Sequence, residues 1–158
     1  MFCICAVDMK ELLQPQSVLF ACDHNSIRSP MAEGLLKLHI GTSIFVQSAG
    51  VKGDREIDGF AITVCREVGV ELSRHRTRSF DDLIEWGDDL DSYDLIVALS
   101  PAAQRRALEY TRFYSLEVEY WQTMDPSGFG DNRDEKLKKY RTVRNQIVQK
   151  IKERFVEK

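Results

Sequence analysis

Long apolar runs, a basic charge balance and a cysteine framework are all missing from this chain of 158 residues. No apolar stretch approaches the roughly 20 residues that span a bilayer. The first residues also lack the basic start and long apolar core of a signal peptide. We therefore expect a cytoplasmic protein with no membrane partner. The formal net charge of −3 gives no general attraction to nucleic acid, so no nucleic-acid partner is expected.

Cysteines are few, and their spacing does not indicate a metal site. The four are Cys3, Cys5, Cys22 and Cys65. In a reducing cytoplasm they should be free thiols. Cys3 and Cys5 form a C-x-C pair, but no second Cys/His pair stands at a zinc-like spacing. We expect no metal and no cofactor.

Signs of an internal boundary are absent as well. The chain has no repeat, no low-complexity tract and no linker rich in proline or glycine. Residues 1–16, closed by Pro15, are interpreted as an N-terminal extension. Residues 17–158 are predicted to form a single domain, which is long enough to bury a stable core without disulfide bonds or bound metals.

Strand-like and helical patterns alternate along that domain. The runs at 17–21 and 93–99 are almost continuously apolar, as in parallel strands that are covered on both faces. Two further strand-like runs lie at 43–47 and 114–120. Strands that alternate with helices predict an α/β fold of three layers, in which a four-stranded parallel sheet has helices on both faces.

Local signals mark where the helices begin. Ser29 and Pro30 are typical of an N-cap and a first helical residue, and they predict a helix that runs to about residue 40. Asp58, Ser79 and Ser100 are predicted caps of three further helices. The last helix is predicted from an apolar stripe at helical spacing: Leu137, Tyr140, Val143, Ile147, Ile151 and Phe155.

The chemistry is expected at Cys22, which ends the first predicted strand. In parallel sheets ligands bind beyond the carboxyl ends of the strands. Arg28 follows six residues later, at the start of the first predicted helix. That spacing alone is common. The apolar strand before it and the serine–proline pair after it favour a phosphate loop between the first strand and the first helix over a cysteine that is merely buried at a strand end.

Such a loop suits nucleophilic attack on an oxyanion. A helix N-terminus, converging backbone N–H groups and an arginine all favour a thiolate and also bind phosphate, sulfate or arsenate. The planar fork of Arg28 can pair with two oxygens at once. We expect Asn25 to hold the shape of the loop, and Ser29 to donate a hydrogen bond to the sulfur of Cys22.

A proton donor is expected far along the chain. Departure of an oxygen from phosphorus requires a proton, and one carboxyl group can supply it and later activate water. Asp125 precedes Pro126 in a glycine-containing loop just after the last predicted strand, at the same edge of the sheet. Asp131 and Asp134 are weaker candidates and suit turn and cap positions better.

Together these segments resemble the low-molecular-weight protein tyrosine phosphatases, from about residue 17 to the end of the chain. The fold is shared with the thioredoxin-coupled arsenate reductases. The motifs are Val18 to Cys22, Asn25, Arg28 to Glu33, Ser48 to Gly50, Val64-Cys65 with Gly69, His75 with Arg78, and Asp125-Pro126.

The resemblance implies a role for each matching residue. Cys22 would be the nucleophile, Arg28 the phosphate clamp and Asp125 the general acid and then base. The phosphate-binding loop would comprise Asp23, His24, Asn25, Ser26, Ile27 and Ser29. Ser48 and His75 would brace that loop together with Asn25 and Ser29.

Several residues depart from the family pattern. His24 replaces a usual glycine, and the carboxylate of Asp23 would repel phosphate if it pointed inward. Ile27 replaces a frequent second cysteine. Ser127 and Gly128 stand where aromatic residues often line the entrance. Ser26 makes one wall of the loop smaller and more polar, which leaves an arginine-phosphate or small-molecule phosphatase open.

The resemblance therefore implies a metal-independent phosphomonoester hydrolase that acts through a phosphocysteine. Its partners would be a phosphorylated protein or a small phosphomonoester, and the chain would be a monomer or weak dimer. An arsenate reductase that uses an external small thiol is the first alternative, because residues 97–102 contain no cysteine. A phosphate-binding module without turnover is the second.

Overall fold

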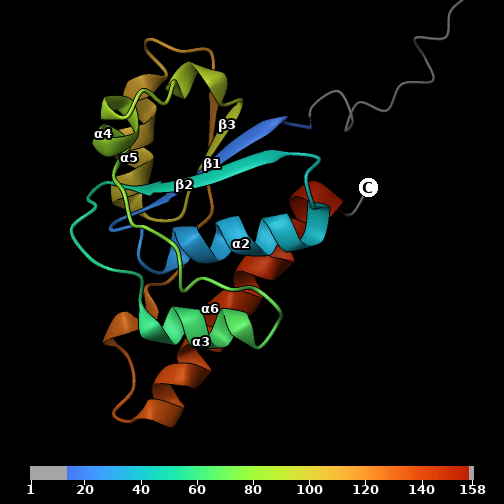
Figure 1. The fold of residues 1–158 in the computed structure, drawn as a ribbon, viewed down its shortest axis with the longest axis vertical. Coiled ribbons are helices and arrows are strands. Elements are labelled where there is room, and N and C mark those ends of the chain that lie inside the picture. Colours follow the sequence, from blue (N-terminus) through green and yellow to red (C-terminus); the bar gives the residue numbers. More distant parts are fainter. Residues whose placement is uncertain (1–13, 157–158) are drawn as a thin grey trace, which may run out of the picture.

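The computed structural model describes residues 14–156 of the chain. Within them lies an open sheet of four parallel strands in the order β2-β1-β3-β4 (Figure 1). The strands are β1 (Ser17–Cys22), β2 (Phe45–Gly50), β3 (Leu95–Ala98) and β4 (Glu117–Tyr120). Their carboxyl ends share one edge, because Cys22 pairs with Gly50 and Ala98 pairs with Tyr120. The predicted α/β fold with a four-stranded parallel sheet is confirmed.

Strand β1 divides the apolar core into two parts. All of its residues are buried, and so are all those of β3. Val18 and Phe20 belong to one core cluster, whereas Leu19 and Ala21 belong to the other. Successive side chains of a strand point to opposite faces of the sheet. The continuous apolar run is therefore what a strand with helices on both sides requires.

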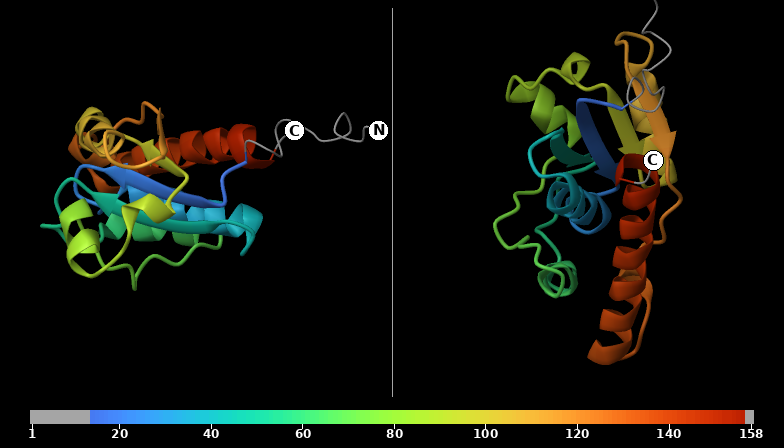
Figure 2. Two further views of the ribbon diagram at one scale, coloured as in Figure 1. Left: turned by 90° about the horizontal axis from the view of Figure 1, so that it is seen from above. Right: turned by 90° about the vertical axis from the view of Figure 1, so that its right-hand side faces the viewer.

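One face of the sheet is covered by α2 (Arg28–Ile40), α6 (Arg133–Ile151) and the short π-helical segment η4 (Lys152–Val156). Helix α3 (Gly59–Arg66) packs against α2 and α6. Figure 2 shows α6 as a long rod, part of which extends beyond the sheet. The predicted apolar stripe of this segment is buried at Leu137, Tyr140, Val143, Ile147, Ile151 and Phe155.

The other face is covered by α4 (Phe80–Glu85), η2 (Leu90–Ser92) and α5 (Pro101–Tyr110). The predicted caps Asp58, Ser79 and Ser100 are confirmed. Ser79 forms a capping box with Asp82, and the Ser100 hydroxyl accepts from the N–H of Ala103. Asp58 caps α3 in the same way. Such local hydrogen bonds satisfy N–H groups that lack a partner within the helix.

Strand β2 lies two to three residues later than the predicted 43–47. Ser48, Ala49 and Gly50, which lie after the predicted strand, continue the ladder with β1. Gly50 is required here because the loop between β1 and α2 approaches its Cα closely. A Cβ atom at this position would lie 2.7 Å from the backbone N of Asn25.

Helix α2 also begins earlier than predicted. Its first residue is Arg28, and Ile27 occupies the N-cap without a side-chain cap. The prediction that Ser29 is the N-cap is therefore wrong. Its hydroxyl lies near the Cys22 sulfur and the carbonyl oxygen of Ala49 instead.

The predicted N-terminal extension falls mostly outside the described residues, as do Cys3 and Cys5. Between residues 14 and 156, no helix has the length and apolar character that crossing a bilayer requires.

Candidate active site

The loop between β1 and α2 encloses the Cys22 thiol. Cys22 is 2% exposed, and its Sγ atom lies 3.0 Å from Oγ of Ser29 in the first turn of α2. The partial positive charge of a helix N-terminus therefore meets this loop. The loop is tied to its surroundings through the main chain, since the N–H of Asp58 donates to the carbonyl of Ser26 over 3.0 Å. Ile27 packs into the apolar core.

Asn25 holds the loop in shape with all of its hydrogen-bonding capacity. It is the one non-glycine residue with a positive φ, 57°, in the part of the chain that the structure describes. Its Nδ2 donates to Oγ of Ser29 (2.9 Å) and of Ser48 (3.0 Å). Its Oδ1 accepts from Nε2 of His75 (2.9 Å) and from the N–H of Arg78 (3.0 Å). These bonds offset the cost of a left-handed backbone, which asparagine tolerates better than most residues.

Nε2 of His75 donates to Oδ1 of Asn25, because an amide oxygen can only accept a hydrogen bond. Burial lowers the pKa of His75, and the positive charges of Arg78 and Lys37 act in the same direction against the opposing charge of Glu33. The structure thus brings Asn25, Ser48 and His75 together around the loop.

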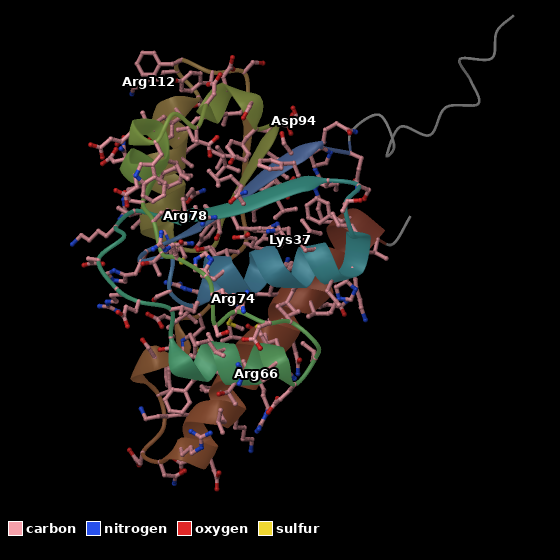
Figure 3. The ribbon with its side chains drawn as sticks, in the orientation of Figure 1. Lys37, Arg66, Arg74, Arg78, Asp94 and Arg112 are labelled. Carbon is pink, nitrogen blue, oxygen red and sulfur yellow. The ribbon has the colours of Figure 1, made fainter. Side chains whose placement is uncertain are left out.

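Glu33 is a member of this network that the motifs did not single out for a role. Its carboxylate is buried and accepts from Oγ of Ser48 (2.6 Å) and from Nζ of Lys37 (2.6 Å). Arg78 lies 3.6 Å from the same group and donates to the carbonyl of Ser48. Figure 3 shows Lys37 on α2 and Arg78 beside the carboxyl end of β2. The four-residue spacing of Glu33 and Lys37 on a helix was the available signal.

Arg28 is buried and links the loop to two distant segments. Its NH1 donates to the carbonyl oxygen of Thr123 over 2.9 Å and to that of Leu99 over 3.3 Å. Its NH2 lies 3.4 Å from Oδ2 of Asp23. The guanidinium is therefore held at the edge where the strands end.

Asp23 and His24 each contact a residue outside the loop. Oδ1 of Asp23 accepts from Oγ of Ser100, the N-cap of α5, over 2.7 Å. His24 lies with Nδ1 2.8 Å from Oδ1 of Asp54, an exposed residue of the segment after β2. Each of the two unusual loop residues thus has a polar partner outside the loop.

Asp125 follows β4 and caps the short 3-10 helix η3 (Pro126–Gly128), where its Oδ1 accepts from the N–H of Ser127 over 2.9 Å. The residue is exposed. Partial desolvation raises the pKa of Asp125, but the hydrogen bonds from Ser127 and the charges of Arg28 and Arg55 lower it by more. The net effect is a lowered pKa.

The described part of the chain contains two free cysteines, Cys22 and Cys65. Cys65 is on α3, in the apolar core cluster to which Cys22 also belongs. Burial raises the pKa of Cys65 to about 12. It is a packing residue rather than a partner for Cys22, since a buried thiol of this kind is inert.

One aromatic side chain, Trp86, lines a cavity together with His75, which the sequence did not indicate. A cavity of about 500 Å³ is lined by Ile57, His75, Thr77 and Trp86, with Glu56, Ser73 and Arg76. Trp86 is the C-cap residue that follows α4, and it is exposed. The sequence does not show that Trp86 shares a cavity with Ile57 and His75, because this depends on how α4 packs.

A thiol at a strand end, a buried arginine and a helix N-terminus around one loop define the class of cysteine-dependent α/β enzymes that bind oxyanions. The profile described as "Low molecular weight phosphotyrosine protein phosphatase" matches residues 17–157. The chain belongs to this family, as its motifs predicted.

Its relatives include two kinds of enzyme. A glutaredoxin arsenate reductase of Synechocystis sp. is 30% identical over 137 residues, which cover 86% of this chain and 93% of that protein. An arsenate reductase structure in the phosphate binding state has a TM-score of 0.71 at 28% identity, covering 87% of this chain and 95% of that one. A low molecular weight protein tyrosine phosphatase from T. tengcongensis has a TM-score of 0.67 at 25% identity, with 86% and 95% covered. Family membership alone does not select between the two activities.

Proposed function

We propose that this chain is a metal-independent phosphomonoester hydrolase that acts through a phosphocysteine at Cys22. The observation that carries the proposal is the convergence of Cys22, Ser29 and Arg28 on one loop at the edge of the sheet where Asp125 also lies. A nucleophile, an oxyanion clamp and a carboxyl group are the parts that such hydrolysis needs.

In the first step the Cys22 thiolate attacks phosphorus. A P–S bond forms as the P–O bond to the leaving group breaks, and Asp125 gives its proton to the departing oxygen. Arg28 stabilises the charge on the equatorial oxygens. A bound anion raises the pKa of a neighbouring carboxyl group, so ligand binding opposes the lowered pKa of Asp125 and favours the acid form.

In the second step a water molecule attacks the phosphocysteine. Asp125, now ionised, accepts a proton from that water as the P–S bond breaks. Cys22 leaves as a thiolate, and the Ser29 hydroxyl at 3.0 Å is placed to donate a hydrogen bond to it. Inorganic phosphate is released, and both side chains return to their starting states.

The substrate is proposed to be a small phosphomonoester or a phosphorylated protein without a strong requirement for tyrosine. Ser127 and Gly128, which follow Asp125-Pro126, offer no ring to stack on an aryl group. Aromatic side chains would otherwise supply much of the contact area for a phenolic substrate.

A second candidate is an arsenate reductase that uses external thiols, and the arsenate reductases among the relatives favour it. Cys22 would displace hydroxide from arsenate to form an S–As(V) bond. An external thiolate would attack the Cys22 sulfur, so that arsenic leaves with two electrons as arsenite and a mixed disulfide remains. A second external thiol would reduce that disulfide. Cys65 is buried and its pKa is raised to about 12, which does not favour it as either thiol.

Parallel assays test the proposal: hydrolysis of an aryl phosphate without metal, and thiol-dependent reduction of arsenate. We expect hydrolysis by the wild type, and background rates for Cys22→Ser and Arg28→Ala. Reduction of arsenate without hydrolysis would replace the proposal with the second candidate. Phosphate binding without either reaction would indicate a binding module.

A further inference from the structure

The carboxylate of Asp23 belongs to the same loop as Arg28 and lies close to its guanidinium. NH1 of Arg28 is occupied by the carbonyl oxygens of Leu99 and Thr123, so the part of the fork left for a ligand includes NH2. That atom lies 3.4 Å from Oδ2 of Asp23. A bidentate arginine–oxyanion contact needs two N–H groups of the fork. The carboxylate of Asp23 therefore faces the side of the guanidinium whose N–H groups an oxyanion would use.

Asp23 is held in that position from the other side. Its Oδ1 accepts from Oγ of Ser100 over 2.7 Å, and Ser100 is fixed in turn as the cap of α5. The Asp23 side chain is 40% exposed, whereas that of Arg28 is 8% exposed. The carboxylate thus retains contact with solvent while the arginine does not, which allows Asp23 to be displaced more easily than Arg28.

We propose that Asp23 is a specificity-determining residue, which makes the loop discriminate against doubly charged oxyanions in favour of singly charged ones. The proposal rests on the proposed function in one respect, that the loop binds an oxyanion. Asp23 lowers the affinity for any anion by competing for Arg28 and by charge repulsion. Because Coulomb energy is proportional to ligand charge, the penalty for a dianion is about twice that for a monoanion in free energy.

The test is a binding titration at one pH with sulfate, a dianion, and methanesulfonate, a monoanion of similar size. Asp23→Asn removes the charge but keeps an acceptor for Ser100. We expect this variant to bind methanesulfonate on the order of tenfold more tightly than the wild type does, and sulfate on the order of a hundredfold. The ratio of the two affinities should therefore shift about tenfold toward sulfate.

Two controls separate this role from a structural one. Asp54→Asn removes an equal charge near the loop, at the partner of His24 and away from Arg28, and should shift the ratio by less than about threefold. Ser100→Ala breaks the tether but leaves the charge of Asp23, so the preference for the monoanion should persist.

The proposal would be overturned if Asp23→Asn bound each anion only as tightly as the wild type does, or more weakly. Asp23 would then be a positioning residue for Arg28. The titration does not depend on turnover, so an inactive wild type that binds anions would count against the proposed hydrolase and not against Asp23. Absence of anion binding in both proteins would overturn the two proposals together.

Discussion

The sulfur of Cys22 lies 3.0 Å from the hydroxyl oxygen of Ser29, which also accepts from Asn25. Ser29 can therefore stabilise the thiolate when it leaves in the second step. We expect Ser29→Ala to slow breakdown of the phosphocysteine about 10- to 100-fold, since one hydrogen bond to a charged group is lost. Pre-steady-state kinetics should then show a burst of alcohol followed by slow turnover. An equal loss in both steps would contradict this role.

Asn25 combines four hydrogen bonds with a positive φ of 57°. We expect Asn25→Ala to lower the free energy of unfolding by about 3 kcal/mol, because buried partners lose their hydrogen bonds. Asn25→Gly loses the same bonds but relieves the left-handed backbone, so it should be about 1 kcal/mol more stable than the alanine variant. Urea unfolding of the two variants measures this difference. Equal stability would show that the backbone is not strained.

The two described cysteines should differ in reactivity. Both are buried, but Cys65 lies within α3 with a pKa raised to about 12, whereas Cys22 opens the loop between β1 and α2, with Ser29 at 3.0 Å. We expect iodoacetate, an anionic reagent, to alkylate Cys22 at pH 8 and leave Cys65 unmodified in the folded protein. Peptide mass mapping reads out both sites, and added phosphate should protect Cys22. Modification of Cys65 first would contradict the packing role.

Glu67 gives the structure a pH-dependent contribution away from the site. Hydrogen bonds from Arg141, then from Arg144, lower its pKa to about 2, against a usual value of 4.5. A carboxyl group with a lowered pKa stabilises the fold above pH 4.5, and this contribution is lost as pH falls toward 2. We expect Glu67→Gln to cost about 1 kcal/mol at pH 7, given its partial exposure, and little near pH 2. A cost that does not depend on pH would indicate lost packing instead.

The proposed role of Asp125 as the general acid can be tested by comparison with Asp131. Asp125→Asn should reduce hydrolysis of an alkyl phosphate about 100-fold or more, but affect an activated aryl phosphate much less, because a good leaving group needs no proton. Asp131→Asn is the matched control, since Asp131 is an exposed aspartate of the same loop. If both variants lose activity equally, Asp125 is not the acid.

What the sequence predicted well was local. The caps at Ser79 and Ser100 involve residues three positions apart, and the buried strand around Phe20 is apolar throughout. Such features are visible in a short window because the partners are neighbours in the chain. The order of the motifs was sufficient to identify the family, and so the fold.

What the sequence did not predict depends on contacts between distant segments. The bond from Arg28 to the carbonyl of Thr123 joins residues 95 positions apart, and that from Ser48 to Glu33 depends on how α2 packs on β2. Ser29 was misassigned as a cap because α2 begins at Arg28, which places Ser29 inside the helix with its hydroxyl 3.0 Å from the Cys22 sulfur. The roles of Cys22 and the other site residues remain predictions.

The central claim is that Cys22 becomes covalently phosphorylated during turnover. Acid quenching of the enzyme with an aryl phosphate, followed by mass spectrometry of the Cys22 peptide, tests it most directly. The account predicts an adduct of one phosphate on Cys22 in the wild type, more of it in Ser29→Ala, and none in Cys22→Ser, which should be inactive. Hydrolysis by Cys22→Ser at the wild-type rate, or turnover with no adduct on Cys22 in either active protein, would contradict it.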